Sequence, residues 1–191
     1  MPSGTKWAAQ NVGARKPSDY GLYFQWGDTV GYTANQVGTG SGQKKFSWAD
    51  YKWYDTDKKV YTKYTTTGAT LDLEDDAAHV NMGGDWHMPT PTQIQELTHN
   101  TTTAWTTSDG VSGMTFTSTK DTSKSIFIPA ASGPWEGLLE MVGENVELFS
   151  SMLSTNDIEY PQALYLSSLG ATFYDGDFTR YGGCPVRGVL G

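Results

Sequence analysis

The sequence predicts an α+β fold, in which helices and antiparallel strands occupy separate parts of the chain. Two segments with helix-capping signals lie in the middle of the 191 residues, at 72–83 and 90–99. After Asn100 the apolar pattern changes to a period of two, which is typical of strands. Helices grouped before strands indicate α+β rather than α/β. At this length we expect one domain, spanning residues 1–191.

The first 70 residues are rich in Trp, Tyr, Gly and Thr, a composition that favours strands and loops over long helices. The segment YGLYFQWGDTVGYT, residues 20–33, predicts a strand with turns. Residues 38–45, GTGSGQKK, predict a flexible exposed loop. The segment FSWADYKWYD, residues 46–55, is compatible with either a short helical turn or a loop.

The first helix is predicted over LDLEDDAAHVNMGG, where Asp72 is the expected N-cap. Acidic residues 74–76 fall in its first turn, where negative charge complements the helix dipole. Gly83 is the expected end of the helix. The face that turns inward is expected to carry Leu73, Ala77 and Val80.

The second helix is predicted over MPTPTQIQELTHN, which contains a complete capping box. Thr90 is the expected N-cap, Pro91 occupies the first helical position, and Gln93 follows at the third. Ile94 and Leu97 are expected to face the core.

The period-two patterns after the second helix predict antiparallel strands. Residues 113–119 and 125–131 are expected to pair through the turn KDTSK, and residues 151–162 are expected to form a polar loop. Later strands are expected at LYLSS (164–168), TFYDGDFT (172–179) and CPVRGVL (184–190). The core is expected to contain Trp86, Met88, Ile126, Phe127 and Ile128.

The charge balance disfavours two classes of partner. The formal net charge is −8, whereas nucleic acids and anionic membranes bind basic surfaces. No window approaches 18 apolar residues, so no membrane insertion is expected, and residues 1–10 lack the apolar region of a signal peptide. Cys184 is the single cysteine, which excludes an intrachain disulfide and a cysteine-based metal cluster.

Residues suited to catalysis or metal binding are scarce. The three histidines, at 79, 87 and 99, lack metal-ligand spacing, and no serine lies in a G-x-S-x-G motif. The acidic run 73–76 is better explained by a helix start than by Ca²⁺, which needs several converging oxygens. The two carboxylates of 175–177 are typical of a turn. We therefore expect no catalytic residues, no metal and no cofactor.

The last 29 residues, 163–191, have an unusual composition. They contain no Lys, Glu, Gln, Met or Trp, whereas the preceding residues hold 10, 7, 7, 6 and 7 of these. Their aromatic residues stand among Gly, Ser, Thr and Asp, which is the composition of a paratope. Alternatively these aromatics belong to the core of a terminal sheet, although a period of two would bury only about half of them.

Six motifs in order cover nearly the whole chain: KWAAQNVGA, DYGLYFQWGD, EDDAAHVNMGGDWHMPT, SIFIPAASG, VGENVELFSS and RYGGCPVRGVLG. They resemble a bacterial and phage family that has the C-type lectin-like fold and is related to formylglycine-generating-enzyme-type domains. The resemblance implies a single C-type lectin-like domain over 1–191, with two helices, antiparallel strands and long loops.

Several members of this fold class are variable proteins of diversity-generating retroelements, in which template adenines are randomised during reverse transcription. Codons of the type AAY become NNY, and NNY encodes none of the five residue types missing from 163–191. The resemblance therefore implies that 163–191 is a diversified region that displays ligand-binding residues.

The family's motifs also imply roles for single residues. Phe149-Ser150-Ser151 stands where the family has Trp-Ser-Ser, and the ending R-x-x-G-x-x-V-R is matched by Arg180, Gly183, Val186 and Arg187. By this match Arg180, Gly183 and Arg187 belong to the scaffold, and the residues between them are display positions. The chain departs from the pattern at Gly188, where Pro is common. Met152, Glu159 and Gln162 follow Phe149 although NNY codons cannot encode them, so either diversification begins later or those codons are fixed.

Other activities of related proteins do not transfer. The formylglycine-generating relatives use a cysteine pair, which this chain lacks, and the E-P-N and W-N-D motifs of Ca²⁺-dependent lectins are absent. We expect noncovalent binding of a macromolecule, protein or glycan, and an extracellular-facing location on a cell surface or phage particle. The expected ligand-binding residues are Tyr165, Leu169, Tyr174, Asp177, Phe178, Thr179 and Tyr181. The alternatives are a fixed-sequence adhesin or glycan-binding module of the same fold, and an enzyme.

Overall fold

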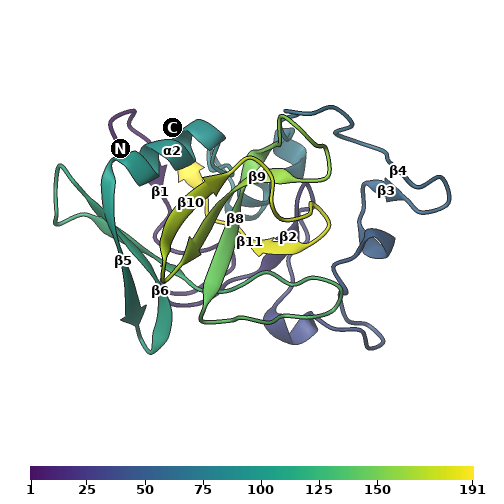
Figure 1. Ribbon diagram of the computed structural model, residues 1–191, viewed down its shortest axis with the longest axis horizontal. Helices are drawn as coiled ribbons and strands as arrows, with labels where there is room; N and C mark the ends of the chain where they lie inside the picture. Colours follow the sequence, from purple (N-terminus) through teal and green to yellow (C-terminus); the bar gives the residue numbers. More distant parts are fainter.

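The computed structural model describes residues 1–191 and shows two helices with twelve strands in five small antiparallel sheets (Figure 1). The predicted α+β class agrees with this architecture. The elements are β1 (Lys6–Trp7), β2 (Tyr23–Gln25), β3 (Tyr54–Asp55), β4 (Val60–Tyr61), α1 (Ala77–Met82), α2 (Pro91–His99), β5 (Thr101–Ser108), β6 (Val111–Ser118), β7 (Ser125–Pro129), β8 (Asn145–Leu153), β9 (Pro161–Ser167), β10 (Gly170–Tyr174), β11 (Gly183–Pro185) and β12 (Val189–Leu190).

The two ends of the chain lie side by side. β1 pairs with β12, which places Lys6 opposite Leu190, and β11 pairs with β2. Figure 1 shows both termini near α2. The last residues of the chain therefore complete sheets that the first 25 residues begin, and they form part of the frame.

Two larger sheets, β5-β6-β7 and β8-β9-β10, share one core with α2. Ile94 and Leu97 of α2 are fully buried there, as predicted. The apolar residues that the two sheets contribute to this core are Met114, Phe116, Ile128, Val146, Leu148, Leu164 and Leu166. A second core surrounds Trp26 and Phe24 and receives Ala77, Ala78, Met88, Phe149 and Cys184.

The capping box of α2 is confirmed. The backbone amide of Gln93 donates to Thr90 Oγ1 at 3.3 Å, and the amide of Thr90 donates to Gln93 Oε1 at 2.9 Å. Pro91 occupies the first helical position, where its missing amide hydrogen has no intrahelical partner to lose. The local signals were sufficient to place this helix.

The start of α1 differs from the prediction. Residues Leu73–Asp75 form a 3₁₀ turn, and the α-helix begins only at Ala77. Asp76, not Asp72, is its N-cap: the Asp76 carboxylate accepts from the amides of His79 at 2.9 Å and Met88 at 2.8 Å. Asp76 thereby also fixes the loop that leads to α2.

The inward face of α1 changes with its start. Leu73 is 58 % exposed and Val80 is 50 % exposed, while Ala77 and Ala78 face the core. Leu73 lies before the α-helix, because the helix begins at Ala77, four residues later than predicted. Leu73 therefore belongs to no helical face. Gly83 ends the helix with φ 74°, as predicted.

Several strand and core predictions need correction. The pair β6–β7 is confirmed, whereas β5 was not predicted. The loop expected over 151–162 is shorter in the structure, because β8 extends to Leu153 and β9 begins at Pro161, so that only residues 154–160 form a loop. Met88 and Ile128 are buried, whereas Trp86, Ile126 and Phe127 are only half-buried. Ile126 and Phe127 lie on β7, an edge strand of its sheet, which has a neighbour on one side only.

Candidate ligand-binding face

The sheet β8-β9-β10 divides its side chains by strand alternation. One face packs into the core through Val146, Leu148, Leu164, Leu166, Ala171 and Phe173. The opposite face, called here the outer face, carries Asn145, Glu147, Tyr165, Ser167, Thr172 and Tyr174. The register aligns Glu147 with Tyr165 and Tyr165 with Thr172 across the three strands. The rings of Tyr165 and Tyr174 meet edge to face with centroids 6.1 Å apart.

A cavity of about 300 Å³ lies at the β8 side of the outer face. It is bounded by the outer-face residues Glu147 and Tyr165, by Phe178, and by the loop 130–144. Three apolar side chains of this loop line the cavity and are also exposed to solvent: Trp135 at 46 %, Leu138 at 53 % and Met141 at 53 % exposure. Clustered exposed apolar side chains beside a cavity are typical of a binding site.

Glu147 has an unusual electrostatic environment. Glu147 as a residue is half-buried, but its Oε2 atom is shielded from solvent and has no hydrogen-bond partner. Burial, and secondarily the negative charge of Asp177, raises the pKa of Glu147 to about 8. The side chain therefore binds a proton near neutral pH in the unliganded protein.

The structure brings together several predicted site residues. Tyr165 and Tyr174 share the outer face, Asp177 lies close enough to influence Glu147, and Phe178 lines the cavity. The ring of Phe178 also packs on Phe149, with centroids 6.3 Å apart, so it joins the cavity to the core.

Two further predicted site residues, Leu169 and Thr179, lie outside the cavity lining. Leu169 is 97 % exposed at the tip of the β9–β10 hairpin, away from the cavity lining. Thr179 is half-buried, and its Oγ1 has no hydrogen-bond partner.

The expected outward position of Tyr181 is wrong. Tyr181 is 6 % exposed, its ring packs on Trp48, and its carbonyl accepts from Gln25 Nε2 at 2.6 Å. The expectation that residues between Arg180 and Arg187 are display positions is also wrong, because Arg180–Val189 are all buried. The physical reason is the pairing of β11 with β2, which draws this part of the tail into the core. Apart from the terminal residues 190–191, the exposed part of the tail lies within 165–179.

Arg180 is a scaffold residue, as the resemblance implied. Its guanidinium donates to Tyr51 Oη at 2.9 Å and to the carbonyls of Lys63, Tyr64 and Ile158 at 2.9–3.2 Å. It also lies over the ring of Tyr61, 4.4 Å from its centroid. One side chain thus ties together three distant segments.

Arg187 and Gly183 serve the same frame. Arg187 is buried and donates to Asn11 Oδ1 at 2.8 Å and to the carbonyls of Ala8 and Phe127 at 2.9 Å. Burial without a carboxylate partner lowers its pKa to about 9. A β-carbon at Gly183 would lie within 2.6 Å of side-chain atoms of its neighbours Phe46 and Pro134, so the chain packs there only without a side chain.

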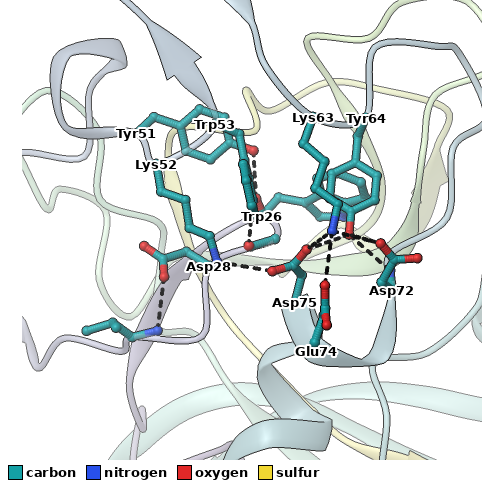
Figure 2. A network of polar contacts seen from close by, with 12 residues as sticks. Trp26, Asp28, Tyr51, Lys52, Trp53, Lys63, Tyr64, Asp72, Glu74 and Asp75 are labelled. Carbon is teal, nitrogen blue, oxygen red and sulfur yellow. Dashed lines mark hydrogen bonds and ion pairs between the residues drawn. The ribbon is translucent and has the colours of Figure 1, made fainter.

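The acidic run before α1 forms an ion-pair network (Figure 2). The carboxylates of Asp72, Glu74 and Asp75 lie close enough together to hold a cation. The ammonium of Lys63 occupies that position, at 2.7, 3.6 and 2.6 Å from them, and Lys52 adds a contact to Asp75 at 3.1 Å. This network fastens the 52–64 region to the start of α1.

None of the three histidines lines the cavity. The Nδ1 atoms of His79 and His87 contact the backbone carbonyls of Trp86 and Met88. Cys184 is fully buried, and burial raises the pKa of its thiol. His79 and His87 therefore contact the backbone of residues 86–88, which leads to α2.

Sequence reasoning missed the contribution of residues before 163. Glu147 lies in the alternating segment VELFSS, whose period of two could have identified β8 and placed Glu147 on the face opposite Val146 and Leu148. The loop 130–144 has no periodicity that would place Trp135, Leu138 and Met141 beside the tail.

Comparison with known proteins does not place the chain in a family, because no family model, curated protein or solved structure matches it. Neither α1 nor α2 is long and apolar enough to cross a membrane.

Proposed function

We propose that this chain is a ligand-binding protein, a receptor or surface-recognition protein with the C-type lectin-like fold. It binds a macromolecule noncovalently through the outer face and the adjoining cavity. The observation that carries the proposal is the grouping of Tyr165, Tyr174 and Phe178 with the exposed side chains of Trp135 and Leu138. Aromatic side chains bury large areas at low entropic cost, so such groups supply most of the binding energy at interfaces.

The frame beneath this face supports recognition that depends on side chains alone. Arg180 and Arg187 fix the chain after residue 179, and the inner face of the sheet packs against the core. Replacing Leu169, Thr172 or Tyr174 leaves these contacts in place. This arrangement favours the diversification by a retroelement that the family resemblance implies for 163–191, with the variable positions confined to 165–179. We assign the protein an extracellular-facing location, on a cell surface or phage particle.

A fixed-sequence adhesin or glycan-binding module is the second candidate. It is favoured by the cavity, because Glu147, Trp135 and Leu138 precede the tail and would stay constant whatever the tail encodes. The neighbouring DNA separates the two candidates. A reverse transcriptase gene and a near-duplicate of the tail's coding sequence, differing at adenines, supports diversification; their absence supports the fixed module.

A selection experiment tests the binding face itself. A displayed library with NNY codons at Leu169, Thr172, Tyr174 and Asp177 is selected against hen lysozyme. A control library carries the same codons at the exposed β5 positions 102–104 and at the exposed Lys120. We expect binders from the outer-face library at least tenfold more often than from the control. Equal yields from both libraries would refute the proposed face.

A further inference from the structure

The cavity beside the outer face contains a carboxyl group without a partner. The side chain of Glu147 forms no ion pair, and its Oε2 atom is shielded from solvent and has no hydrogen-bond partner. Buried polar groups are normally satisfied, and each exception asks for an explanation. A bound ligand that carries a donor would supply the missing partner.

The negative charge around the cavity has no cationic counterpart in this chain. Asp177 acts on Glu147 through its charge, and Glu140 also lines the cavity, yet neither forms an ion pair. Lys45 reaches the loop 130–144 but pairs with Glu136 at 2.9 Å, and neither of these residues lines the cavity. A counter-charge for these acidic residues would therefore be positive and would have to come from a ligand.

The residues that line the cavity indicate which kind of cation it would bind. Trp135, Tyr165 and Phe178 line the cavity with aromatic rings, and Leu138 and Met141 add aliphatic surface. Aromatic faces attract cations, most often guanidinium groups, and apolar walls cover the methylene stem of a long basic side chain. A volume of about 300 Å³ suits a side chain rather than a folded segment.

We propose that this cavity binds an arginine or lysine side chain of a protein ligand, with Glu147 as its counter-ion. This inference rests on the proposed function, because it names the chemistry of one contact within the same face. The inference requires the ligand to be a protein with an exposed basic residue. The overall charge of −8 complements such a partner.

Cation binding is coupled to proton release. The groups that face Glu147 are Tyr165 from β9, Cys184 from β11, Asp177 and Glu140, while α2 packs on the opposite face of the sheet. None of them is a cation, so the free protein holds the proton of Glu147 up to a pKa of about 8. A bound guanidinium favours the carboxylate and expels that proton. Affinity therefore rises by roughly 20-fold between pH 6.5 and 8.5.

The test uses the peptide acetyl-Gly-Arg-Gly-amide and its citrulline counterpart, which has the same shape without the charge. Binding is followed through amide chemical shifts of the whole protein. We expect saturable shifts at Glu147, Tyr165 and Phe178 with the arginine peptide, and at least tenfold weaker binding of the citrulline peptide. The variant Glu147→Gln should weaken arginine binding at least tenfold and remove its pH dependence.

Glu144→Gln is the matched control, because it removes one negative charge three residues away, at an exposed side chain outside the cavity. We expect it to change arginine binding less than twofold. The proposal is overturned if the arginine peptide gives no saturable shift there, if citrulline binds equally well, or if both variants behave alike. These outcomes leave the outer face as a binding surface intact, since the library selection tests that face independently.

Discussion

Glu147 on β8 lies directly opposite Tyr165 on β9, and its carboxyl group has no hydrogen-bond partner in the folded chain. Strand pairing thus places a shielded carboxyl group beside an aromatic residue on the proposed binding face. Such an arrangement opposes stability, and functional sites often do so. It leads to the first prediction.

Glu147→Gln should stabilise the unliganded protein above pH 5. The folded pKa is raised to about 8 from the ordinary value of 4.5, so the folded state binds more protons than the unfolded state between these values. Stability of the wild type therefore falls as pH rises through this window. After allowance for solvent screening, we expect a loss of about 1 to 2 kcal/mol between pH 5 and 8 that Glu147→Gln abolishes. Urea unfolding of both proteins measures it, and parallel pH profiles would contradict it.

Arg180→Lys should destabilise the fold by about 2 to 4 kcal/mol, because an ammonium cannot reproduce the planar fork of donors. The carbonyls of Lys63, Tyr64 and Ile158 would lose partners at once. Arg15→Lys is the matched control at an exposed position, with an expected change within about 0.5 kcal/mol. Equal unfolding free energies for the two variants would show that Arg180 does not hold the frame.

Asp76→Ala should be more damaging than Asp72→Ala, although the sequence pointed to Asp72 as the helix cap. Asp76 satisfies two buried amides, at His79 and Met88, so its loss should cost about 2 to 3 kcal/mol. Asp72 is exposed and contributes a surface ion pair with Lys63, worth about 1 kcal/mol or less. Thermal unfolding of both variants decides between the two residues, and the reverse order would restore Asp72 as the cap.

Tyr174→Ala and Tyr181→Ala should separate binding from folding. Tyr174 is 37 % exposed on the outer face, and its removal should change stability by about 0.5 kcal/mol while weakening ligand binding. Tyr181 is buried against Trp48, and its removal should cost about 3 kcal/mol. Denaturant unfolding of both variants checks stability, and binding is checked by introducing Tyr174→Ala into a lysozyme-binding clone from the library that retains Tyr174. Similar stability losses for the two variants would place Tyr174 in the core.

The elements that could be predicted are those stabilised by interactions between residues close together in the sequence. The capping box places α2 because Thr90 and Gln93 satisfy each other within three residues. Tyr181 resembled a display residue because nothing near it in sequence reveals the distant pairing of β11 with β2. Aromatic composition favoured surface display for Tyr174 and Tyr181 alike, and only long-range packing separates them.

The candidate site was predictable only in its C-terminal half for the same reason. Tyr165 and Tyr174 stand in recognisable strands, so their shared face follows from alternation. The alternation of VELFSS indicates the strand that carries Glu147, but the contacts that bring Glu147 and the loop 130–144 to the tail are tertiary and have no signal in the sequence.

The central claim is that a fixed frame carries a face whose side chains are free to change. The most direct test replaces Leu169, Thr172, Tyr174 and Asp177 together by Ser and measures the free energy of unfolding in urea. We expect a change within about 2 kcal/mol, the sum for four independent surface substitutions, with an unchanged dependence on urea concentration. A loss of about 4 kcal/mol or more would show that these residues hold the fold together, which would contradict the claim.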